Sequence, residues 1–348
     1  MTSIHSLYPE ELKEYLLASG EKPFRAGQIF SWLHEKRAGS FDDMTDISLA
    51  LREKLKRDFS FTRLFIERLQ ESSLDGTRKY LFRLSDGNMI ESVFMKYHHG
   101  NSVCVSTQVG CAMGCRFCAS TVDGLVRSLD SAEILAQVYE IERDTKERVS
   151  NVVLMGSGEP MENYENVIRF IRLITHEKGN HMSARNITVS TCGIPDKIRA
   201  FAKEGLPVTL ALSLHASDDA TRRKLMPIAN KYALSEVLSA CDYYFSETGR
   251  RVSYEYSVVR GVNDSVFEAE KLSALLTGKN AHVNLIPVNP IRERSFERPD
   301  KNALLAFQNA LVKNGINATI RREMGSDIDG ACGQLRRRVL SENEEGGT

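Results

Sequence analysis

Three cysteines lie within the eight-residue segment CAMGCRFC, at positions 111, 115 and 118. The segment follows a strand-like run, which predicts that the three thiols stand on a loop at the end of a strand. Gly110 and Gly114 allow the loop backbone to fold tightly enough for the sulfurs to converge. Cysteine thiolates are the usual ligands of iron–sulfur clusters. Three thiolates leave one iron of a four-iron cluster without a protein ligand, and that iron can bind a substrate or cofactor.

A structural zinc site is the alternative for these cysteines. Zinc in such sites usually has four ligands in two pairs, and no second Cys or His pair accompanies this loop in the sequence. The seven cysteines lie at positions 104, 111, 115, 118, 192, 241 and 332. Their odd number in a chain of 348 residues argues against a disulfide-stapled secreted protein. We interpret Cys192 and Cys241 as buried thiols that pack like small apolar side chains.

The elements that position this loop are strands and helices that alternate from about residue 100. The strand-like runs are SVCVSTQV, NVVLMG, RNITVST, PVTLALSLH, RVSYEYSVV and AHVNLIPV. Asp130 and Glu133 form a capping box before one of the intervening helices. Six strands that alternate with helices predict a parallel sheet, and both an open sheet and an incomplete barrel fit the pattern. Chemistry in either fold gathers at the carboxyl ends of the strands.

The first 60 residues predict a small helical unit. Pro9 suits a helix start and Gly20 a stop, a second helix is predicted around Phe24 to Leu33, and Ile47 to Phe59 predict a third. The basic residues of this unit fit a solvated surface or an RNA contact equally well. Residues 61–98 alternate like strands, and the tail SENEEGGT is predicted to be disordered.

The composition is that of a globular protein, with 42% hydrophobic and 26% charged residues. Lys+Arg and Asp+Glu both number 46, so the neutral chain lacks the overall basic charge of a nonspecific nucleic-acid binder, although a local basic face remains possible. No apolar run is long enough for a membrane span, and the N-terminus lacks the apolar region of a signal peptide. We expect a cytoplasmic protein with no membrane association.

The CxxxCxxC spacing, with Phe117 before the third cysteine, resembles the signature of radical S-adenosylmethionine (SAM) enzymes. Further segments resemble the RlmN/Cfr RNA methyltransferases, in the order of that family: CVSTQVGCAMGCRFCAS, MGSGEPMENYENV, ITVSTCGI, LALSLHA, VNLIPVNP and DIDGACGQL. Ser157 departs from the pattern, where the family has Met. The resemblance implies an α/β fold, a partial (βα)6 radical SAM barrel with a small N-terminal helical accessory domain. It implies a helical domain over 1–60, a strand-rich extension over 61–96, the radical SAM core over 97–331 and a C-terminal segment over 332–348.

The resemblance also implies the roles of single residues. Cys111, Cys115 and Cys118 would ligate a [4Fe–4S] cluster. Gly158 and Glu159 would contact the amino group of SAM, and the rest of the SAM site would be Ser190, Ser213, Leu214, His215 and Asn289. Cys332 would become S-methylated, Cys104 would be its resolving partner, and Glu91 would be a proton acceptor. Taken singly, each residue of the SAM and catalytic sets also fits an ordinary structural role.

Two SAM molecules per turnover are implied by the family mechanism. One methylates the Cys332 thiolate, and the other is cleaved to a 5′-deoxyadenosyl radical that takes hydrogen from the new methyl group. The resulting carbon radical adds to adenine, and attack by Cys104 releases the methylated base and leaves a Cys104–Cys332 disulfide. Direct displacement fails at carbon 2 of adenine because that carbon is electron-poor, so a radical route is reasonable.

The implied product is 2-methyladenosine in 23S rRNA and in tRNA next to the anticodon, with an electron donor such as flavodoxin or ferredoxin. Methylation of adenine at position 8, as in Cfr, is the alternative within the family. Two further alternatives are a zinc-stabilised RNA-binding protein and a radical SAM enzyme with a small-molecule substrate. Arginines near Cys332, at positions 321, 322 and 336–338, are candidate contacts for RNA phosphates.

Overall fold

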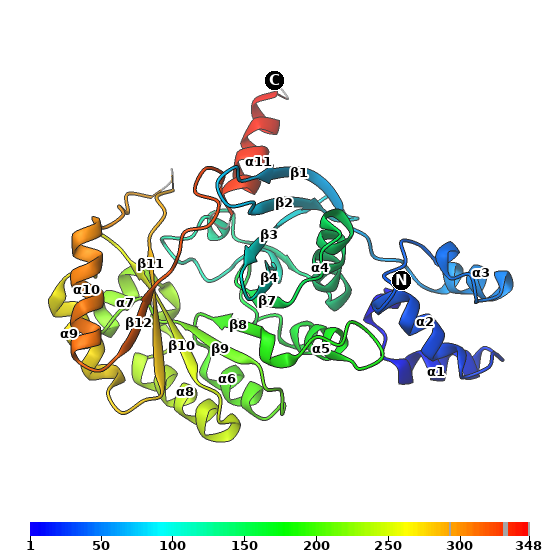
Figure 1. Cartoon of the computed structure of the whole chain (residues 1–348), viewed down its shortest axis with the longest axis horizontal. Coiled ribbons are helices and arrows are strands. Elements are labelled where there is room, and N and C mark those ends of the chain that lie inside the picture. Colours follow the sequence, from blue (N-terminus) through cyan, green and yellow to red (C-terminus); the bar gives the residue numbers. More distant parts are fainter. Residues whose placement is uncertain (292–293, 330–332, 347–348) are drawn as a thin grey trace.

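The computed structural model describes residues 1–291, 294–329 and 333–346. Its centre is a ten-stranded sheet in the order β1-β2-β3-β4-β7-β8-β9-β10-β11-β12 (Figure 1). The strands from β4 to β12 are parallel to their neighbours. Within the described residues β1 and β12 are the edges of this sheet, so the barrel is open, as the sequence predicted for an incomplete barrel.

Six strand–helix units form the parallel part of the sheet, which confirms the predicted fold class. The strands are β4 (Gly100–Cys104), β7 (Asn151–Leu154), β8 (Ile187–Thr191), β9 (Thr209–Ser213), β10 (Val252–Val258) and β11 (Ala281–Pro287). The helices that follow them are α4 (Ser131–Thr145), α5 (Tyr164–Thr175), α6 (Pro195–Ala202), α7 (Asp219–Leu225) with α8 (Leu234–Thr248), α9 (Val266–Leu276) and α10 (Lys301–Lys313). A seventh parallel strand, β12 (Asn317–Ile320), was not predicted, because only Ala318 of its four residues is buried and the segment carries no apolar run.

Three antiparallel strands extend the sheet on the β4 side, as residues 61–98 predicted: β1 (Phe65–Glu71), β2 (Arg78–Arg83) and β3 (Met89–Tyr97). The predicted strand SVCVSTQV is wrong as one element. It ends at Cys104, and its second half forms β5 (Gln108–Gly110), which pairs with β6 (Leu125–Ser128) in a separate ribbon. The break directs the chain away from the sheet and into the cysteine loop.

The helical unit of the first 60 residues lies at one side of the body in Figure 1. It contains η1 (Ile4–Ser6), α1 (Pro9–Ala18), α2 (Arg25–His34), η2 (Phe41–Asp43) and α3 (Leu49–Asp58). Pro9 begins α1 as predicted, and Gly20 follows its end with φ +76°. The predicted second helix is present as α2, but Phe24 lies directly before its first residue and is exposed, so its inclusion in the helix was wrong.

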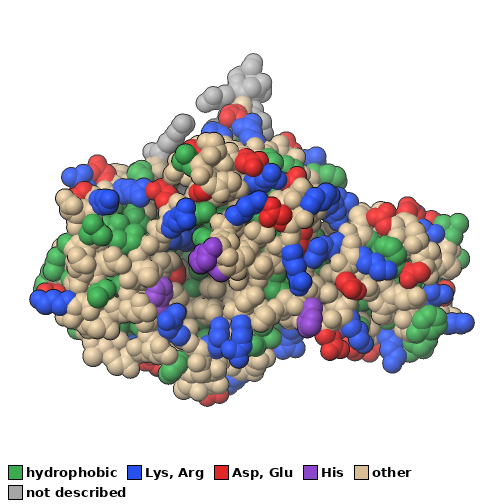
Figure 2. Space-filling view, viewed as in Figure 1, with side chains coloured by type: hydrophobic (Ala, Val, Ile, Leu, Met, Phe, Trp, Pro, Cys, Tyr) green, Lys and Arg blue, Asp and Glu red, His purple; other side chains and the backbone are tan. Residues whose placement is uncertain are grey.

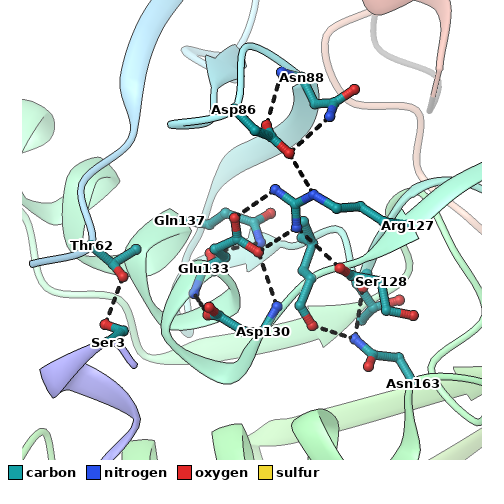
Figure 3. Close-up of polar contacts among 12 residues, drawn as sticks. Ser3, Thr62, Asp86, Asn88, Arg127, Ser128, Asp130, Glu133, Gln137 and Asn163 are labelled. Carbon is teal, nitrogen blue, oxygen red and sulfur yellow. Dashed lines mark hydrogen bonds and ion pairs between the residues drawn. The ribbon is translucent and has the colours of Figure 1, made fainter. Parts of the chain in front are cut away.

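The capping box before α4 is present, and it fixes the base of the β5–β6 ribbon. Asp130 Oδ1 accepts from Glu133 N at 2.8 Å, and the Glu133 carboxylate accepts from Asp130 N at 3.0 Å. Arg127 of β6 donates to both Glu133 oxygens at 2.8 Å and to Asp86 at 2.6 Å (Figure 3). Asn163 Nδ2 donates to the carbonyls of Thr107 and Leu129. These bonds hold the two ends of the cysteine loop against the sheet.

The C-terminal helix α11 (Gln334–Gly346) contradicts the predicted disorder of the tail over residues 341–346, whereas 347 and 348 lie outside the described residues. Leu335 and Val339 are buried and pack with Leu81 of β2. Glu342 accepts from Arg68 of β1 at 2.8 Å. Composition suggested disorder because it does not register such packing against a distant sheet.

The short helices η3 (Ala119–Thr121), η4 (Ala184–Asn186) and η5 (Pro227–Asn230) complete the described elements. No helix in the described part of the chain is long and apolar enough to cross a lipid bilayer.

Candidate active site at the carboxyl ends of the strands

A cavity of about 550 Å³ lies at the carboxyl ends of the parallel strands. Its lining includes these predicted site residues: Cys104, Cys111, Cys115, Cys118, Gly158, Glu159, Ser190, Ser213, His215 and Asn289. They come from segments up to 185 positions apart (289 − 104). One cavity therefore brings these candidate residues together at the strand ends, where the sequence led us to expect them.

Hydrogen bonds to distant segments fix the cysteine loop. Cys111 N donates to the carbonyl of Gly124 at 2.9 Å, and Arg116 N donates to the carbonyl of Leu225 at 2.9 Å. A Cβ on Gly110 would lie 2.0 Å from the Gly124 carbonyl oxygen, so only glycine fits there. The Thr121 hydroxyl lies 2.9 Å from the carbonyls of Cys115 and Cys118.

The Cys111 and Cys115 thiols favour their protonated form unless a positive centre is bound. Burial raises the pKa of Cys111 to about 12 and raises the pKa of Cys115 well above its usual value. Metal coordination reverses this preference because thiolates are the ligands. In the described residues, no three His, Cys, Asp or Glu side chains are grouped to hold a single metal ion. Cys111, Cys115 and Cys118 all line the same cavity, so the thiolate donors that an iron–sulfur cluster needs are gathered at one place.

The segment after β7, residues 155–160, packs against the turn that follows β4. A Cβ on Gly158, whose φ is +108°, would lie 2.6 Å from the Gln108 side chain. Glu159 N donates to Gln108 Oε1 at 2.9 Å, while the Glu159 carboxylate accepts from Cys192 N at 2.7 Å and Met161 N at 3.0 Å. Burial raises the pKa of Glu159, and the hydrogen bonds from the backbone amides of Cys192 and Met161 oppose that shift.

His215 follows β9 in the left-handed region, with φ +57°. Its Nδ1 accepts from Ser257 N at 2.8 Å, and its ring meets Phe117 edge to face with centroids 4.7 Å apart. Burial lowers the pKa of His215 to about 3, so the ring is neutral near pH 7. Leu214 differs from its neighbours: it is fully buried and does not line the cavity. Only its backbone can contribute to the site.

The three predicted catalytic residues have different placements. Cys104 ends β4, lines the cavity and packs among Val93, Met95 and Met155. Glu91 of β3 is buried and lies outside the cavity lining. Cys332 lies outside the described residues, although Gly333 directly after it is packed on the cysteine loop. A Cβ on Gly333 would lie 2.6 Å from Ser120 N.

Comparisons with known proteins identify the family. A model of the radical SAM superfamily matches residues 105–271, and a model of the ribosomal RNA large subunit methyltransferase N-terminal domain matches residues 2–60. A probable dual-specificity RNA methyltransferase RlmN from Lachnospira eligens is 58% identical over 345 residues, which cover 99% of each chain. The chain belongs to the RlmN family.

Other relatives agree with this assignment. A probable dual-specificity RNA methyltransferase RlmN from Lachnoclostridium phytofermentans is 60% identical over 96% of this chain and 94% of its own. The crystal structure of a radical SAM methyltransferase from Sphaerobacter thermophilus is 43% identical, with a TM-score of 0.92 over 96% of this chain and 99% of that one. Membership of the RlmN family implies a [4Fe–4S] cluster and SAM as cofactors. The three cysteines that line the cavity, Cys111, Cys115 and Cys118, fit the cluster.

Sequence reasoning missed Arg222, which is fully buried beside the RlmN-family site. Its guanidinium donates to the carbonyls of Cys192, Leu214 and Ser213 at 2.6, 3.3 and 3.4 Å, so it joins the ends of β8 and β9. Its position in the segment TRRK gave no signal, because arginines in charged helices are usually exposed.

The hydroxyl pair of Ser120 and Ser157 was also missed. The two buried Oγ atoms lie 2.9 Å apart, so the bond joins the cysteine loop to the segment after β7. Ser157 is the residue that departs from the family pattern, and in this chain its hydroxyl hydrogen-bonds to that of Ser120.

Replacement of Gly158 by alanine is expected to weaken SAM binding at least tenfold, or roughly 1.4 kcal/mol. The added methyl group forces the 155–160 segment away from Gln108 and displaces Glu159. The measurement is calorimetric titration of SAM into anaerobically reconstituted protein. Gly278→Ala is the matched control, because Gly278 also has positive φ but nothing within 4 Å of its added Cβ. Equal SAM affinity in the two variants would contradict the argument.

The stability of the protein is expected to fall as pH drops below 6.5, in part through His215. Its pKa is about 3 when folded and near 6.5 when unfolded, so the unfolded state binds the extra proton in this window. His215→Asn keeps an acceptor for Ser257 N and tolerates positive φ. Between pH 7.5 and 5 the native chain should lose about 2 kcal/mol more than this variant. Denaturant unfolding at the two pH values measures the difference, and equal losses would exclude a buried neutral His215.

Proposed function

We propose that this chain forms 2-methyladenosine in 23S rRNA and in tRNA next to the anticodon, as a radical SAM methyltransferase. The observation that carries the proposal is the near-complete match to relatives named dual-specificity RNA methyltransferase RlmN. The cavity supports it, because the sequence-predicted cysteines and the candidate SAM residues line the same walls. The same relatives favour this product over the Cfr-type alternative and over a small-molecule substrate.

Cys111, Cys115 and Cys118 would hold the cluster in this proposal. The cluster and SAM, when bound, supply the radical that removes hydrogen and the methyl group that is transferred. Glu159 is held by the hydrogen bond from its own amide to Gln108 and by those that its carboxylate accepts from the amides of Cys192 and Met161. Its carboxylate lines the cavity and would bind the ammonium group of SAM. Ser190 and Ser213, whose Oγ atoms are 3.5 Å apart, Leu214 through its backbone, neutral His215 and Asn289 would complete the SAM site.

Cys332 would carry the methyl group, and Cys104 would resolve the protein–RNA crosslink. In that step the Cys104 thiolate bonds to the Cys332 sulfur, and the bond between that sulfur and the transferred carbon breaks. The electron pair of the broken bond stays with the carbon, which takes a proton and becomes the methyl group of the base. An external thiol reductant then reduces the disulfide. The place of Cys104 on the cavity wall supports this role.

RNA contacts are proposed near the cavity mouth, where exposed Arg321 and Arg322 contribute to the lining. Figure 2 shows Lys and Arg side chains spread across the middle of the face that it draws. Arg336, Arg337 and Arg338 are weaker candidates than the sequence suggested, because they pair with Asp123 and Asp329.

The helical unit over 1–60 is proposed as a further RNA contact, although Lys56 and Arg37 already pair with carboxylates. The division at 61–96, 97–331 and 332–348 stays a prediction. A flavodoxin or ferredoxin is the proposed electron donor, and the cytoplasm, which contains both RNA classes, is the proposed compartment.

The product is tested by incubating reduced, reconstituted protein with SAM and with unmodified 23S rRNA fragments or tRNA. Nucleoside mass spectrometry should find 2-methyladenosine in both. The 8-methyl isomer would support the Cfr-type alternative, and no methylated adenosine in either RNA would overturn the proposal.

Cys104→Ala is expected to trap a covalent protein–RNA crosslink, because no thiolate is then in place to attack the Cys332 sulfur and release the base. Denaturing gel electrophoresis detects the crosslink, and Cys241→Ala, a buried thiol distant from the cavity lining, is the control. Normal turnover by the Cys104 variant would show that this thiol has no resolving role.

A further inference from the structure

Glu91 joins the middle of the sheet to the start of the C-terminal helix. Its Oε2 accepts from Gly333 N at 2.5 Å, and its Oε1 accepts from Arg336 N at 2.6 Å. Gly333 directly precedes α11 and Arg336 lies in its first turn, where backbone N–H groups have no partner within the helix. Glu91 therefore caps α11 from a residue 242 positions away (333 − 91).

Lys79 of β2 holds this carboxylate from the other side. Its Nζ lies 2.9 Å from Glu91 Oε2 and donates to the carbonyl of Asp329 at 2.7 Å. The Lys79 side chain is fully buried and the Glu91 side chain is 3% exposed. Asp329 is held further by Gln70 of β1, with bonds of 3.0 and 3.2 Å.

Lys79 and Glu91 thus bind backbone groups on both sides of residues 330–332. Lys79 binds the carbonyl that precedes this stretch, and Glu91 binds the amide that follows it. On the Gly333 side, contact with Ser120 brings the chain against the cysteine loop. The ion pair between Lys79 and Glu91 connects these two backbone contacts to each other.

Stability alone is a weak explanation for such a pair. Removing two charges from water is costly, and well-packed apolar residues of similar size are often at least as stabilising. An apolar pair would fill the same space, but it would hold neither the Asp329 carbonyl nor the Gly333 amide. What the charged pair adds is a fixed position for two backbone groups that flank one short segment.

We propose that Lys79 is a positioning residue that, through Glu91, fixes the flanks of the segment containing Cys332 and so couples SAM cleavage to methyl transfer. This rests on the proposed function, in which Cys332 carries the methyl group. With its flanks held, the methylated sulfur is presented to the site where hydrogen is removed. With its flanks released, SAM is still cleaved, but the cleavage is less often followed by methylation.

The test uses Lys79→Met in full-length, reconstituted protein. The ratio of methylated adenosine to 5′-deoxyadenosine should fall at least tenfold, while iron content and the rate of SAM cleavage stay within twofold of the native values. Lys271→Met is the matched control, because Lys271 also pairs with carboxylates, Asp218 and Glu268, but far along the chain from these groups. An unchanged ratio in Lys79→Met would overturn the proposal.

Glu91→Gln is the second variant, should Lys79→Met fail to fold. The glutamine keeps the shape of Glu91, but its NH₂ group cannot accept from an amide, so one of the two capping bonds is lost. The same fall in the product ratio is expected, and an unchanged ratio would overturn the proposal as well. Because the family resemblance also makes Glu91 a proton acceptor, a fall in this variant supports the anchoring only together with faster exchange of the Gly333 and Arg336 amides.

Hydrogen exchange separates this proposal from the proposed function. The amides of Gly333 and Arg336 should exchange at least tenfold faster in either variant, while those of β8 and β9 are unchanged. If exchange is faster in the variants but the native protein does not methylate RNA, the proposed function is contradicted and the anchoring by Lys79 and Glu91 still holds. Unchanged exchange would remove the anchoring, whatever the enzyme's activity.

Discussion

The close approach of two backbone turns is the constraint on which the rest of the site depends. Gly156 N donates to the Val105 carbonyl at 3.0 Å, and Thr107 N donates to the Ser157 carbonyl at 2.8 Å, so the chain leaving β4 and the chain leaving β7 share a ladder beyond the sheet. A Cβ at position 156 or 158 would lie within 2.7 Å of the opposing turn. This contact sets where the cysteine loop begins and where Glu159 is held, and hence how the three cysteines and Glu159 are arranged around the cavity.

Buried charged groups near the cavity are held by hydrogen bonds or an ion pair, although the Nη1 atom of Arg222 has no hydrogen-bonding partner among the described residues. Arg222 is compensated by carbonyl oxygens at two strand ends, and Glu159 by backbone amides. Lys79 and Glu91 compensate each other. Such groups are costly to bury, so each fixes the backbone atoms that it binds. The walls of the cavity are therefore held by the main chain as much as by apolar packing.

The sequence predicted those parts of the molecule that depend on local pattern. Six strand runs, the capping box at Asp130 and the cysteine loop are each visible within a few residues, because periodicity and spacing express them directly. The unpredicted parts depend on partners far along the chain. The break between β4 and β5, the short β12 and the buried positions of Arg222 and Lys79 are set by tertiary contacts. The helix over the acidic tail was missed because it is stabilised by packing on β2 and not by its own composition.

The bonds that shape the cysteine loop also bear on how the enzyme matures. The loop amide of Arg116 reaches Leu225, and the start of the loop reaches Gly124, so these contacts exist only after α7 and the β5–β6 ribbon have docked. In a zinc finger the metal organises an otherwise unfolded peptide. Here hydrogen bonds within the protein shape the loop, so insertion of a cluster after the chain has folded would not require the loop to be built around the metal.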